Sequence, residues 1–478
     1  MRTHSSRPRR FRSLLLIPAL LLSGCASFSP DSGMSVVSDV ARETLKKDVA
    51  FVRSADDAER ANGAVQRQLA RPLTADAAVQ VALLNNKGLQ AAYNELALAE
   101  TSLVQQSLPP NPTFSLSRIS GDGASEIERQ VVGDILALAT LPFRSDIERD
   151  RFRQAQLKAA LETLRLAAEI RRGYFRAVAA NELAGLLTEA KSTAEAAANL
   201  AKKLGETGSL NKLDQAREQV FYAETTADLA TVRQNAASAR EKLARLMGLW
   251  GDDLGFRIPD RLPPLPRQPL ALAHVEADAV GHRIDLQIAR IELTALAKSL
   301  DLTEATRFVT LLDVAGIDRK TRDPETPPFR ERGFDVLFQI PVFDGGEVAV
   351  RRATETYNLA FNRLTERAIN VRSEARDAYR VYRSTYDVAS HYQREILPLR
   401  AIISEEMQLR LSSMQVDVFA LVTEARQRVA SLRAAIEAKR DFWLAQSDLK
   451  ATIDGGGAGG SEPDRSTTTT AQAAESGH

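Results

Sequence analysis

The chain has little of what most catalytic and metal-binding sites require. It contains one cysteine, Cys25, and five histidines among 478 residues. A lone cysteine leaves no intrachain disulfide, and the histidines show none of the spacings that metal ligands adopt. Aromatic residues make up only 6% of the sequence, which argues against a thick globular core and favours thin layers of alanine-rich helices. The 63 basic and 62 acidic residues nearly cancel, so nucleic acid is not an expected partner.

Other possible sites of chemistry are equally weak. No arrangement of Ser, His and Asp suggests a nucleophile, and Asp344-Gly345-Gly346 lacks the context of a phosphate-binding loop. Met407 and Met414 offer the ligand type that copper(I) prefers, although helix packing explains them better. The charged residues of the long segments are typical of solvated helix faces. We therefore expect no catalytic residues, no cofactor, no bound metal, and a protein that is not an enzyme.

The first 25 residues resemble the signal peptide of a bacterial lipoprotein. Five arginines precede a short apolar run, residues 14–22, which leads into Ser23-Gly24-Cys25. The run is too short to span a bilayer permanently, and the pattern predicts cleavage before Cys25 and lipidation of its thiol, including palmitate. The alternative is an ordinary signal peptide that ends at a cysteine. Ala26, in place of an aspartate, favours the outer membrane of a Gram-negative cell, with the lipid-anchored protein extending into the periplasm.

The two halves of the chain loosely repeat each other. Leu89-Gln90 recurs as Leu286-Gln287, and Ala216-Arg217 recurs as Ala425-Arg426. Each half runs through a helix, two β-like stretches and then very long helices, which predicts a duplicated unit. We expect a signal peptide (residues 1–24), a lipidated, partly helical tether (25–70), a first repeat (71–250), a proline-rich linker (251–270), a second repeat (271–453) and a disordered tail (454–478).

Apolar residues at steps of three and four predict unusually long helices. Thr74 is a plausible N-cap for the first of them, and Pro398 is expected to bend or interrupt a later one. Turns are expected at Thr207-Gly208-Ser209 and at Ser413-Met414-Gln415. The predicted helices cover residues 73–108, 144–204, a return to about 248, 274–304, a long segment through 353–382, and a last helix to about 453.

Four stretches of eight to twelve residues have β-like character. In one of them Phe334, Val336, Phe338 and Ile340 alternate with other residues, so that one face is apolar. Such lengths suit membrane-crossing strands, but open edges are not tolerated in hydrocarbon, and closure requires several chains. The alternative is two soluble hairpins that cap a helical bundle. The expected strands are Thr113–Ser120, Gln130–Leu141, Phe308–Asp318 and Gly333–Phe343, with the polar segment 319–332 outside the membrane.

From about residue 70 to 453 the chain resembles the outer-membrane efflux protein family, the TolC-like exit ducts. The matching motifs are the junction Ile340-Pro341-Val342-Phe343-Asp344-Gly345-Gly346, Arg283-Ile284-Asp285-Leu286, Pro109-Pro110-Asn111-Pro112, and Ser209–Arg217 with its echo Val416–Arg426. Three residues depart from the family pattern: Lys87 and Ile284 stand where it usually has proline, and Met414 where a glycine is common at the helical tip.

The resemblance implies a mainly α fold with a small β part. Each chain would give four strands to a twelve-stranded outer-membrane barrel in a homotrimer, and its long helices would form a coiled-coil barrel. An inner-membrane transporter and a periplasmic adaptor would deliver the substrate. Strand residues Phe334, Val336, Phe338 and Ile340 would face outer-membrane lipid. The tips that contact the adaptor would be Thr207, Gly208, Ser209, Ser413, Met414 and Gln415.

The resemblance therefore implies the outer-membrane channel of a tripartite efflux or type I export system. The run Met414–Arg426 is similar to a branch often associated with metal or copper export, and drugs are the other candidate substrate. Glu206 and Asp417 are candidates for the pore aperture because they flank the turns, although a solvated helix end explains either residue alone better. The alternatives are a periplasmic adaptor or a structural coiled-coil lipoprotein, neither of which accounts for the duplication.

Overall fold

The computed structural model describes residues 27–121, 123–413 and 415–455. These residues form two compact units. Within them, unit 1 comprises residues 27–39, 91–160 and 287–366, and unit 2 comprises residues 40–90, 161–286 and 367–455. Each unit therefore takes segments from both halves of the sequence. In the described stretch of the chain, no helix is both long enough and apolar enough to cross a membrane.

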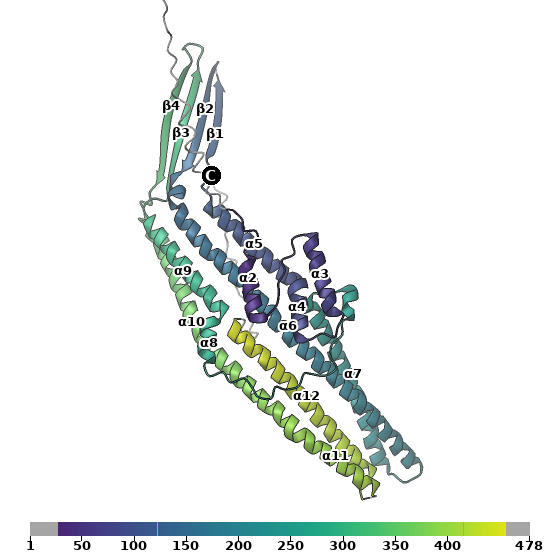
Figure 1. Cartoon of the computed structure of the whole chain (residues 1–478). Coiled ribbons are helices and arrows are strands. Elements are labelled where there is room, and N and C mark those ends of the chain that lie inside the picture. Colours follow the sequence, from purple (N-terminus) through teal and green to yellow (C-terminus); the bar gives the residue numbers. More distant parts are fainter. Residues whose placement is uncertain (1–26, 122, 414, 456–478) are drawn as a thin grey trace, which may run out of the picture. The chain divides into compact units, whose positions relative to one another are not determined.

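Unit 1 contains a four-stranded antiparallel sheet in the order β1-β2-β3-β4 (Figure 1). The register is continuous across the sheet, so that Phe114 pairs with Val131, Val131 with Gly316, and Gly316 with Phe334. Antiparallel neighbours share a face, and residues two apart along a strand return to it. The strands are β1 (Thr113–Gly121), β2 (Ala124–Asp134), β3 (Leu311–Arg322) and β4 (Phe329–Gln339).

The second predicted strand, Gln130–Leu141, is wrong beyond Asp134. Residues 135–141 instead begin helix α6 (Ile135–Glu206). The carboxylate of Asp134 accepts a hydrogen bond from the amide of Ala137 at 2.7 Å, which caps the new helix. The leucines and alanines that follow favour helix over strand. Pro142 was expected to bound this segment but lies inside α6, near its beginning.

The two strands of the second half are also displaced from the predictions Phe308–Asp318 and Gly333–Phe343. Both strands extend further from the helices than predicted, because β3 continues to Arg322 and β4 already begins at Phe329. Much of the segment 319–332, expected as a loop, is therefore strand. At the other end, Pro341 has no amide hydrogen to give to a ladder, and its carbonyl accepts from Gly345 at 2.8 Å in a turn.

The two opening helices are each broken once. Residues 73–108 form α4 (Ala75–Asn85) and α5 (Lys87–Ser107), and residues 274–304 form α8 (Val275–His282) and α9 (Ile284–Ala305). The hydroxyl of Thr74 caps α4 as predicted, accepting from Ala77 at 3.1 Å. Leu89 and Leu286 are both the third residue of the helix after the break, and both are buried, as expected for equivalent positions of a repeat.

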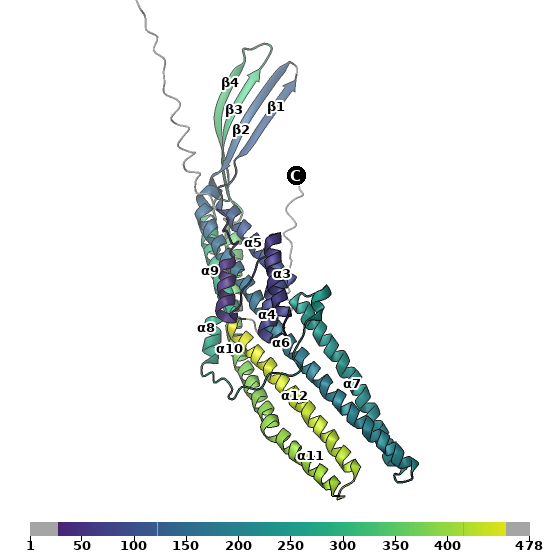
Figure 2. The ribbon, with the colours of Figure 1, turned by 45° about the vertical axis from the view of Figure 1, so that its right-hand side comes forward.

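Two helical hairpins form much of unit 2, and their turns lie at the same end of that unit in both views (Figures 1 and 2). One consists of the unit 2 part of α6 with α7 (Lys212–Met247), and the other of α11 (Leu397–Ser412) with α12 (Val418–Asp454). Helix α10 (Glu347–His391) reaches α11 through a π-helical turn, Tyr392–Ile396, just before Pro398. The predicted interruption at Pro398 is thus confirmed; the amide of Leu397 bonds the carbonyl of Tyr392, five residues back.

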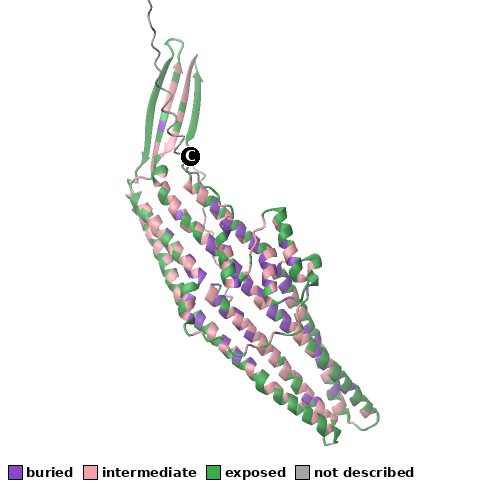
Figure 3. Cartoon of the chain, in the orientation of Figure 1, coloured by how far each residue is buried: buried purple, intermediate pink, exposed green. Residues whose placement is uncertain are grey.

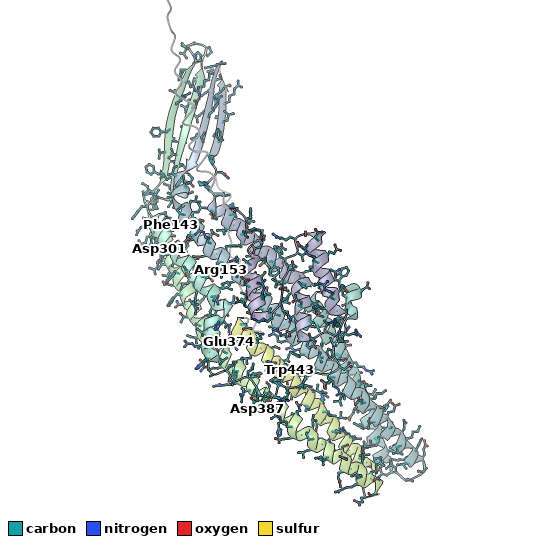
Figure 4. All side chains as sticks on the ribbon, viewed as in Figure 1. Phe143, Arg153, Asp301, Glu374, Asp387 and Trp443 are labelled. Atoms are coloured by element: carbon teal, nitrogen blue, oxygen red, sulfur yellow. The ribbon has the colours of Figure 1, made fainter. Side chains whose placement is uncertain are left out.

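Aromatic side chains hold the proline-rich linker onto the helices of unit 2. Tyr382 and Phe442 are fully buried, with ring centres 5.5 Å apart, and Phe442 packs edge-on against Trp443 at 5.2 Å. The indole of Trp443, labelled in Figure 4, donates to the carbonyl of Pro263 at 3.2 Å, and the hydroxyl of Tyr386 donates to the carbonyl of Arg267 at 3.0 Å. Side chains of the helices therefore supply several of the hydrogen bonds that hold the linker in place.

The expected tether is partly helical in the region described. It contains α2 (Met34–Val40), the π-helical turn Ala41–Leu45 and α3 (Ala55–Leu69). Ser54 and Asp57 form a reciprocal capping box at the start of α3, as their spacing allows. Alanine is common among the buried helix residues, in keeping with the expectation of closely packed thin layers. Cys25, the predicted signal peptide and the residues beyond 455 lie outside the described residues.

Candidate functional site

The register divides the side chains of the sheet between two faces of different chemistry. The apolar–basic face carries the apolar residues Phe114, Leu116, Ile127, Val131, Leu312, Val314, Phe334, Val336 and Phe338, and the charged residues Arg118, Arg129, Asp318, Lys320, Arg322, Arg330 and Arg332. The acidic face carries the charged residues Glu126, Glu128, Asp134, Asp313, Arg319, Glu331 and Asp335 among mostly small, polar and some apolar side chains.

The two faces differ in exposure on the central strands β2 and β3, which Figure 3 shows as largely half-buried between the exposed edge strands β1 and β4. Phe334 is 81% exposed, Phe114 78% and Leu116 72%, all on the apolar–basic face. On β2 and β3 every residue of the acidic face is half-buried or buried, down to 5% for Ala315. The acidic face is therefore the more sheltered one on the two central strands, whereas both faces are exposed on the edge strands β1 and β4. An array of exposed large apolar side chains of this kind requires a cover, because burying each would gain roughly 1.5–3 kcal/mol.

Ion pairs form within each face and not across the sheet. Arg319 bonds the carboxylates of Glu126 at 2.8 Å and Glu128 at 2.7 Å on the acidic face. Asp318 on the other face accepts from Arg330, and from Arg332 at 3.3 Å. After these pairs the faces remain unbalanced. Six acidic residues and one basic residue give the acidic face −5, and six basic and one acidic give the apolar–basic face +5.

The junction motif between β4 and α10 has a backbone role. The turn is closed by Gly345 donating to the carbonyl of Pro341, and by Gly346 donating to the carboxylate of Asp344 at 3.1 Å. Gly346 has φ +75°, and a Cβ there would lie 2.2 Å from the carbonyl oxygen of Arg307. Only glycine fits this position, which accounts for the second glycine of the motif.

Exposed apolar side chains also gather where the strands of unit 1 meet its helices. Phe143 on α6, labelled in Figure 4, is 61% exposed. Phe308, Ile340 and Val342 are 60%, 50% and 73% exposed. The apolar surface of the sheet thus continues onto the helix ends. Of the four predicted lipid-facing residues, Phe334, Val336 and Phe338 share one exposed face of β4, and Ile340 follows directly after the strand.

The first predicted tip is a tight turn between α6 and α7. Thr207, Gly208 and Ser209 are all exposed, and Gly208 has φ +75°. The amide of Ser209 donates back to the carbonyl of Leu204 at 2.9 Å, which is the pattern of a glycine-terminated helix. Glu206 is exposed at the helix end, so the structure brings no other group to it.

The second predicted tip joins α11 to α12. Ser413 and Gln415 are exposed, and the amide of Gln415 donates to the carbonyl of Arg410 at 2.9 Å. Met414 lies outside the described residues. The carboxylate of Asp417 accepts from the amide of Ala420 at 2.8 Å, so Asp417 acts as a helix cap, as Asn211 does for α7.

A pair of buried glutamates near the tips is not apparent from the sequence. Glu218 and Glu424 are 5% and 7% exposed, and each lies seven residues after the N-cap of its helix. Arg426 of α12 bonds Glu218 of α7 at 3.1 Å and lies over the ring of Phe221 at 4.1 Å, which ties one hairpin to the other. Arg400 of α11 bonds Glu424 at 3.2 Å. Glu218 and Glu424 are recognised as equivalent positions of the two halves when each is counted from the N-cap of its helix, and not when matching residue pairs of the sequence are aligned.

The Arg283-Ile284-Asp285-Leu286 motif surrounds a buried cation. Arg283 is 4% exposed, and its guanidinium grips Asp285 at 3.0 and 2.6 Å and Glu374 of α10 at 2.6 Å (Figure 4 labels Glu374). Burial alone would lower the pKa of Arg283, but the hydrogen bonds and charges of Asp285 and Glu374 outweigh it, and the net effect raises the pKa. The motif therefore ties the α8–α9 break to α10 in unit 2.

Metal-binding groups do not converge in the part of the chain that the structure describes, where no three His, Cys, Asp or Glu side chains gather around a common point. His282 contacts the carbonyl of Asp278 at 2.9 Å, and His391 lies 3.2 Å from the carboxylate of Glu395 on the same helix face. Met407 is half-buried on α11.

Several solved structures that resemble this chain are outer-membrane channels. The outer-membrane channel OprN superposes with a TM-score of 0.67 over 91% of this chain and 98% of its own, at 15% identity. This chain has the TolC-like fold of the outer-membrane channels. The Campylobacter jejuni CmeC outer membrane channel has a TM-score of 0.65, with 80% of this chain, 86% of that chain and 16% identity. The predicted TolC-like architecture, long helices with four strands per chain, is confirmed.

Sequence comparison adds one curated relative. The cobalt-zinc-cadmium resistance protein CzcC of Cupriavidus metallidurans is 27% identical over 198 residues, which cover 39% of this chain. The match spans 44% of CzcC, less than half its length. No protein-family model matches the TolC-like chain.

Proposed function

We propose that the protein is the outer-membrane channel of a tripartite efflux or type I export system. The observation that carries the proposal is the two-faced sheet. One face presents most of the large exposed apolar side chains, and the other carries six carboxylates and is sheltered on the two central strands. A sheet that separates lipid from an aqueous pore needs this alternation. The strands of 9 to 12 residues, at about 3.3 Å per residue and a tilt of about 40°, have the length to cross hydrocarbon.

The open edges of the sheet favour a homotrimer. In the part of the chain that the structure describes, strands β1 and β4 each have a neighbour on one side only. In hydrocarbon the unpaired amides and carbonyls of such edges carry a large cost, so the edges must pair with other copies. Three chains supply twelve strands, which close a barrel without edges. This proposal distinguishes the protein from an adaptor or a purely structural lipoprotein, neither of which requires an apolar-faced antiparallel sheet.

The helical hairpins of unit 2 would lie in the periplasm, where their turns would meet an adaptor and receive substrate from an inner-membrane transporter. The turns present small polar groups and backbone, which suits a contact that has to form and release. The adaptor-contacting residues in this proposal are Thr207, Gly208, Ser209, Ser413, Met414 and Gln415. Cys25 would carry the lipid that anchors the mature chain to the outer membrane.

The substrate in this proposal is a cation, with divalent metal ions as the first candidates and cationic drugs as the second. The acidic face carries −5 per chain and would line the pore, so it would concentrate cations there. The printed name of CzcC, which refers to cobalt, zinc and cadmium resistance, points the same way.

The decisive experiment is the migration of the protein from purified outer membranes on a mildly denaturing gel, with and without heating. A heat-labile trimer in the outer-membrane fraction is the expected result. Cys25→Ser should release the anchor yet leave the trimer band, because the barrel and not the lipid holds the chains together. A protein that runs only as a monomer in mild detergent, in both forms, would rule out the channel.

Charge removal on the acidic face should change the ion selectivity of the channel. Glu126→Gln, Glu128→Gln and Glu331→Gln together reduce the net charge of that face from −5 to −2 per chain. The cation-to-anion permeability ratio in planar bilayers should fall by a factor of a few, most steeply at low salt where screening is weak. Arg118→Gln, on the other face of the sheet, is the control and should leave the ratio unchanged. Equal ratios in all variants would show that the acidic face does not line the pore.

A further inference from the structure

The apolar–basic face is divided sharply along the strands. We call the residues of this face that pair across neighbouring strands a row. Counted from the end where the strands join the helices, the first three rows contain only apolar residues and glycine. These rows are Leu312 with Phe338, then Gly133 with Val314 and Val336, then Phe114 with Val131, Gly316 and Phe334.

The next three rows, toward the hairpin loops, contain charged residues, and the change from apolar to charged occurs from one row to the next. They are Leu116 with Arg129, Asp318 and Arg332, then Arg118 with Ile127, Lys320 and Arg330, then Ser120 with Ser125 and Arg322. Every basic residue of this face lies in these rows, together with its one acid. We call these six basic residues the basic belt: Arg118, Arg129, Lys320, Arg322, Arg330 and Arg332.

Most of the belt is not neutralised by the protein. Asp318 engages Arg330 and Arg332, and one carboxylate cannot balance two guanidinium groups. Between residues 27 and 455, as far as the structure describes them, Arg118, Arg129, Lys320 and Arg322 have no ion pair. All four are exposed, so their hydrogen-bond donors are open to a partner.

The charge is specific to this face of the sheet. At the same level of the strands the opposite face carries Glu126, Glu128 and Glu331, with Arg319 as its one base. A general surface charge would not separate by sign across a single layer of backbone. The belt also directly adjoins the apolar rows, so a partner that covers both must be apolar on one side and anionic on the other.

We propose that the basic belt binds the phosphate groups of the phosphorylated glycolipid that forms the outer leaflet, while its acyl chains cover the apolar rows. The inference depends on the proposed function, because it requires the sheet to lie in the outer membrane. With the helices on the periplasmic side, the hairpin loops face outward, where this lipid is found. Arginine forks bond phosphate oxygens in pairs, and several of them on neighbouring strands match a headgroup with more than one phosphate. In the trimer the belt would recur three times around the barrel.

The test uses purified full-length trimer and four lipids: phosphorylated lipopolysaccharide, the same lipid after enzymatic dephosphorylation, phosphatidylglycerol and phosphatidylcholine. Bound lipid is counted by native mass spectrometry. The wild-type protein should retain the phosphorylated glycolipid in preference to all three others, and the retention should fall with added salt. Equal retention of phosphatidylglycerol, or of the dephosphorylated lipid, would overturn the proposal.

A charge variant provides a second, independent arm. Arg118→Gln, Arg129→Gln and Lys320→Gln together should weaken retention of the glycolipid by about a hundredfold, since each loses a cation beside anionic lipid. The matched control removes three exposed arginines from α10 through Arg351→Gln, Arg352→Gln and Arg363→Gln, and should bind as wild type does. Unchanged retention by the belt variant would refute the inference.

The trimer band on the gel distinguishes a failure of the proposed channel from a failure of the proposed lipid site. If wild type is not a membrane trimer, the channel itself is refuted. If the wild-type trimer forms but shows no preference for the phosphorylated lipid, only the lipid site is refuted. The wild-type lipid comparison decides the question even if the belt variant fails to assemble.

Discussion

Replacing Phe338 with arginine is expected to abolish assembly of the trimer in the outer membrane. Phe338 lies in the apolar rows of β4, 58% exposed and between Phe334 and the junction with α10, so that its side chain would meet lipid. An arginine at such a depth costs roughly 2–4 kcal/mol per chain, and the cost is incurred by every chain of the trimer. The measurement is the amount of heat-labile trimer in purified outer membranes, compared with total protein.

Leu337→Arg provides a close control. Leu337 is the preceding residue and is 57% exposed, but its side chain lies on the acidic face, opposite Asp313 of β3. The same arginine there would enter water beside a carboxylate, and the trimer yield should remain near wild type. If the two variants assemble equally well, or if Leu337→Arg is the more damaging, the assignment of the faces to lipid and pore is reversed or wrong.

The second large effect is expected at Arg283. Replacing it with alanine removes the two hydrogen bonds of 3.0 and 2.6 Å that its guanidinium donates to Asp285, which is 16% exposed and keeps the amide of Leu286 as a donor, and also releases Glu374. Removing one partner of a buried ion pair commonly costs about 3–5 kcal/mol, because the remaining charge is left uncompensated. Chemical or thermal unfolding of the purified protein should show this loss directly.

A neighbouring exposed pair shows what a less buried contact contributes. Arg376→Ala removes a partner of Glu276 at 3.3 Å, where both side chains are about half exposed, and should cost about 1 kcal/mol or less. Arg283→Lys should fall between the two, since it retains the charge but not the planar fork that grips Asp285. An Arg283→Ala protein as stable as Arg376→Ala would show that the motif has no structural role.

The helices were largely predictable from the sequence, because they are long and their apolar residues recur with a single period. The strands were less so. Residues 135–141 are apolar enough for a membrane strand, and only the cap formed by Asp134 with Ala137 shows that the helix starts there. Conversely, the charged segment that follows Ile317 resembles a loop, yet its ladder continues. Asp318 pairs with Arg330 and Arg332 of β4 on one face, and Arg319 pairs with two glutamates of β2 on the other. In this segment the alternation of charged residues between the two faces, and not only the alternation of apolar residues, indicates a strand.

The candidate sites were predictable to different degrees. The junction glycines and the Arg283 motif stand out in the sequence, but not the contacts that require them, such as the carbonyl of Arg307 against Gly346. Glu218 and Glu424 look like any other helix glutamate in the sequence. What distinguishes them is burial against an arginine, which lies 208 positions from Glu218 and 24 positions from Glu424. Such partners follow from the packing of two hairpins, which no local pattern specifies.

The unbroken ladder from β1 to β4 limits how this wall can change. Adding or deleting one residue within any strand would turn every side chain beyond that point to the other face of the sheet. Carboxylates would then lie on the apolar–basic face and phenylalanines on the acidic face. Changes in length are harmless only in the connecting loops between residues 121 and 124 and between residues 322 and 329. If the sheet lies in the outer membrane as proposed, changes in these two loops would alter the surface that the cell displays, while the length and polarity of the strands would remain fixed.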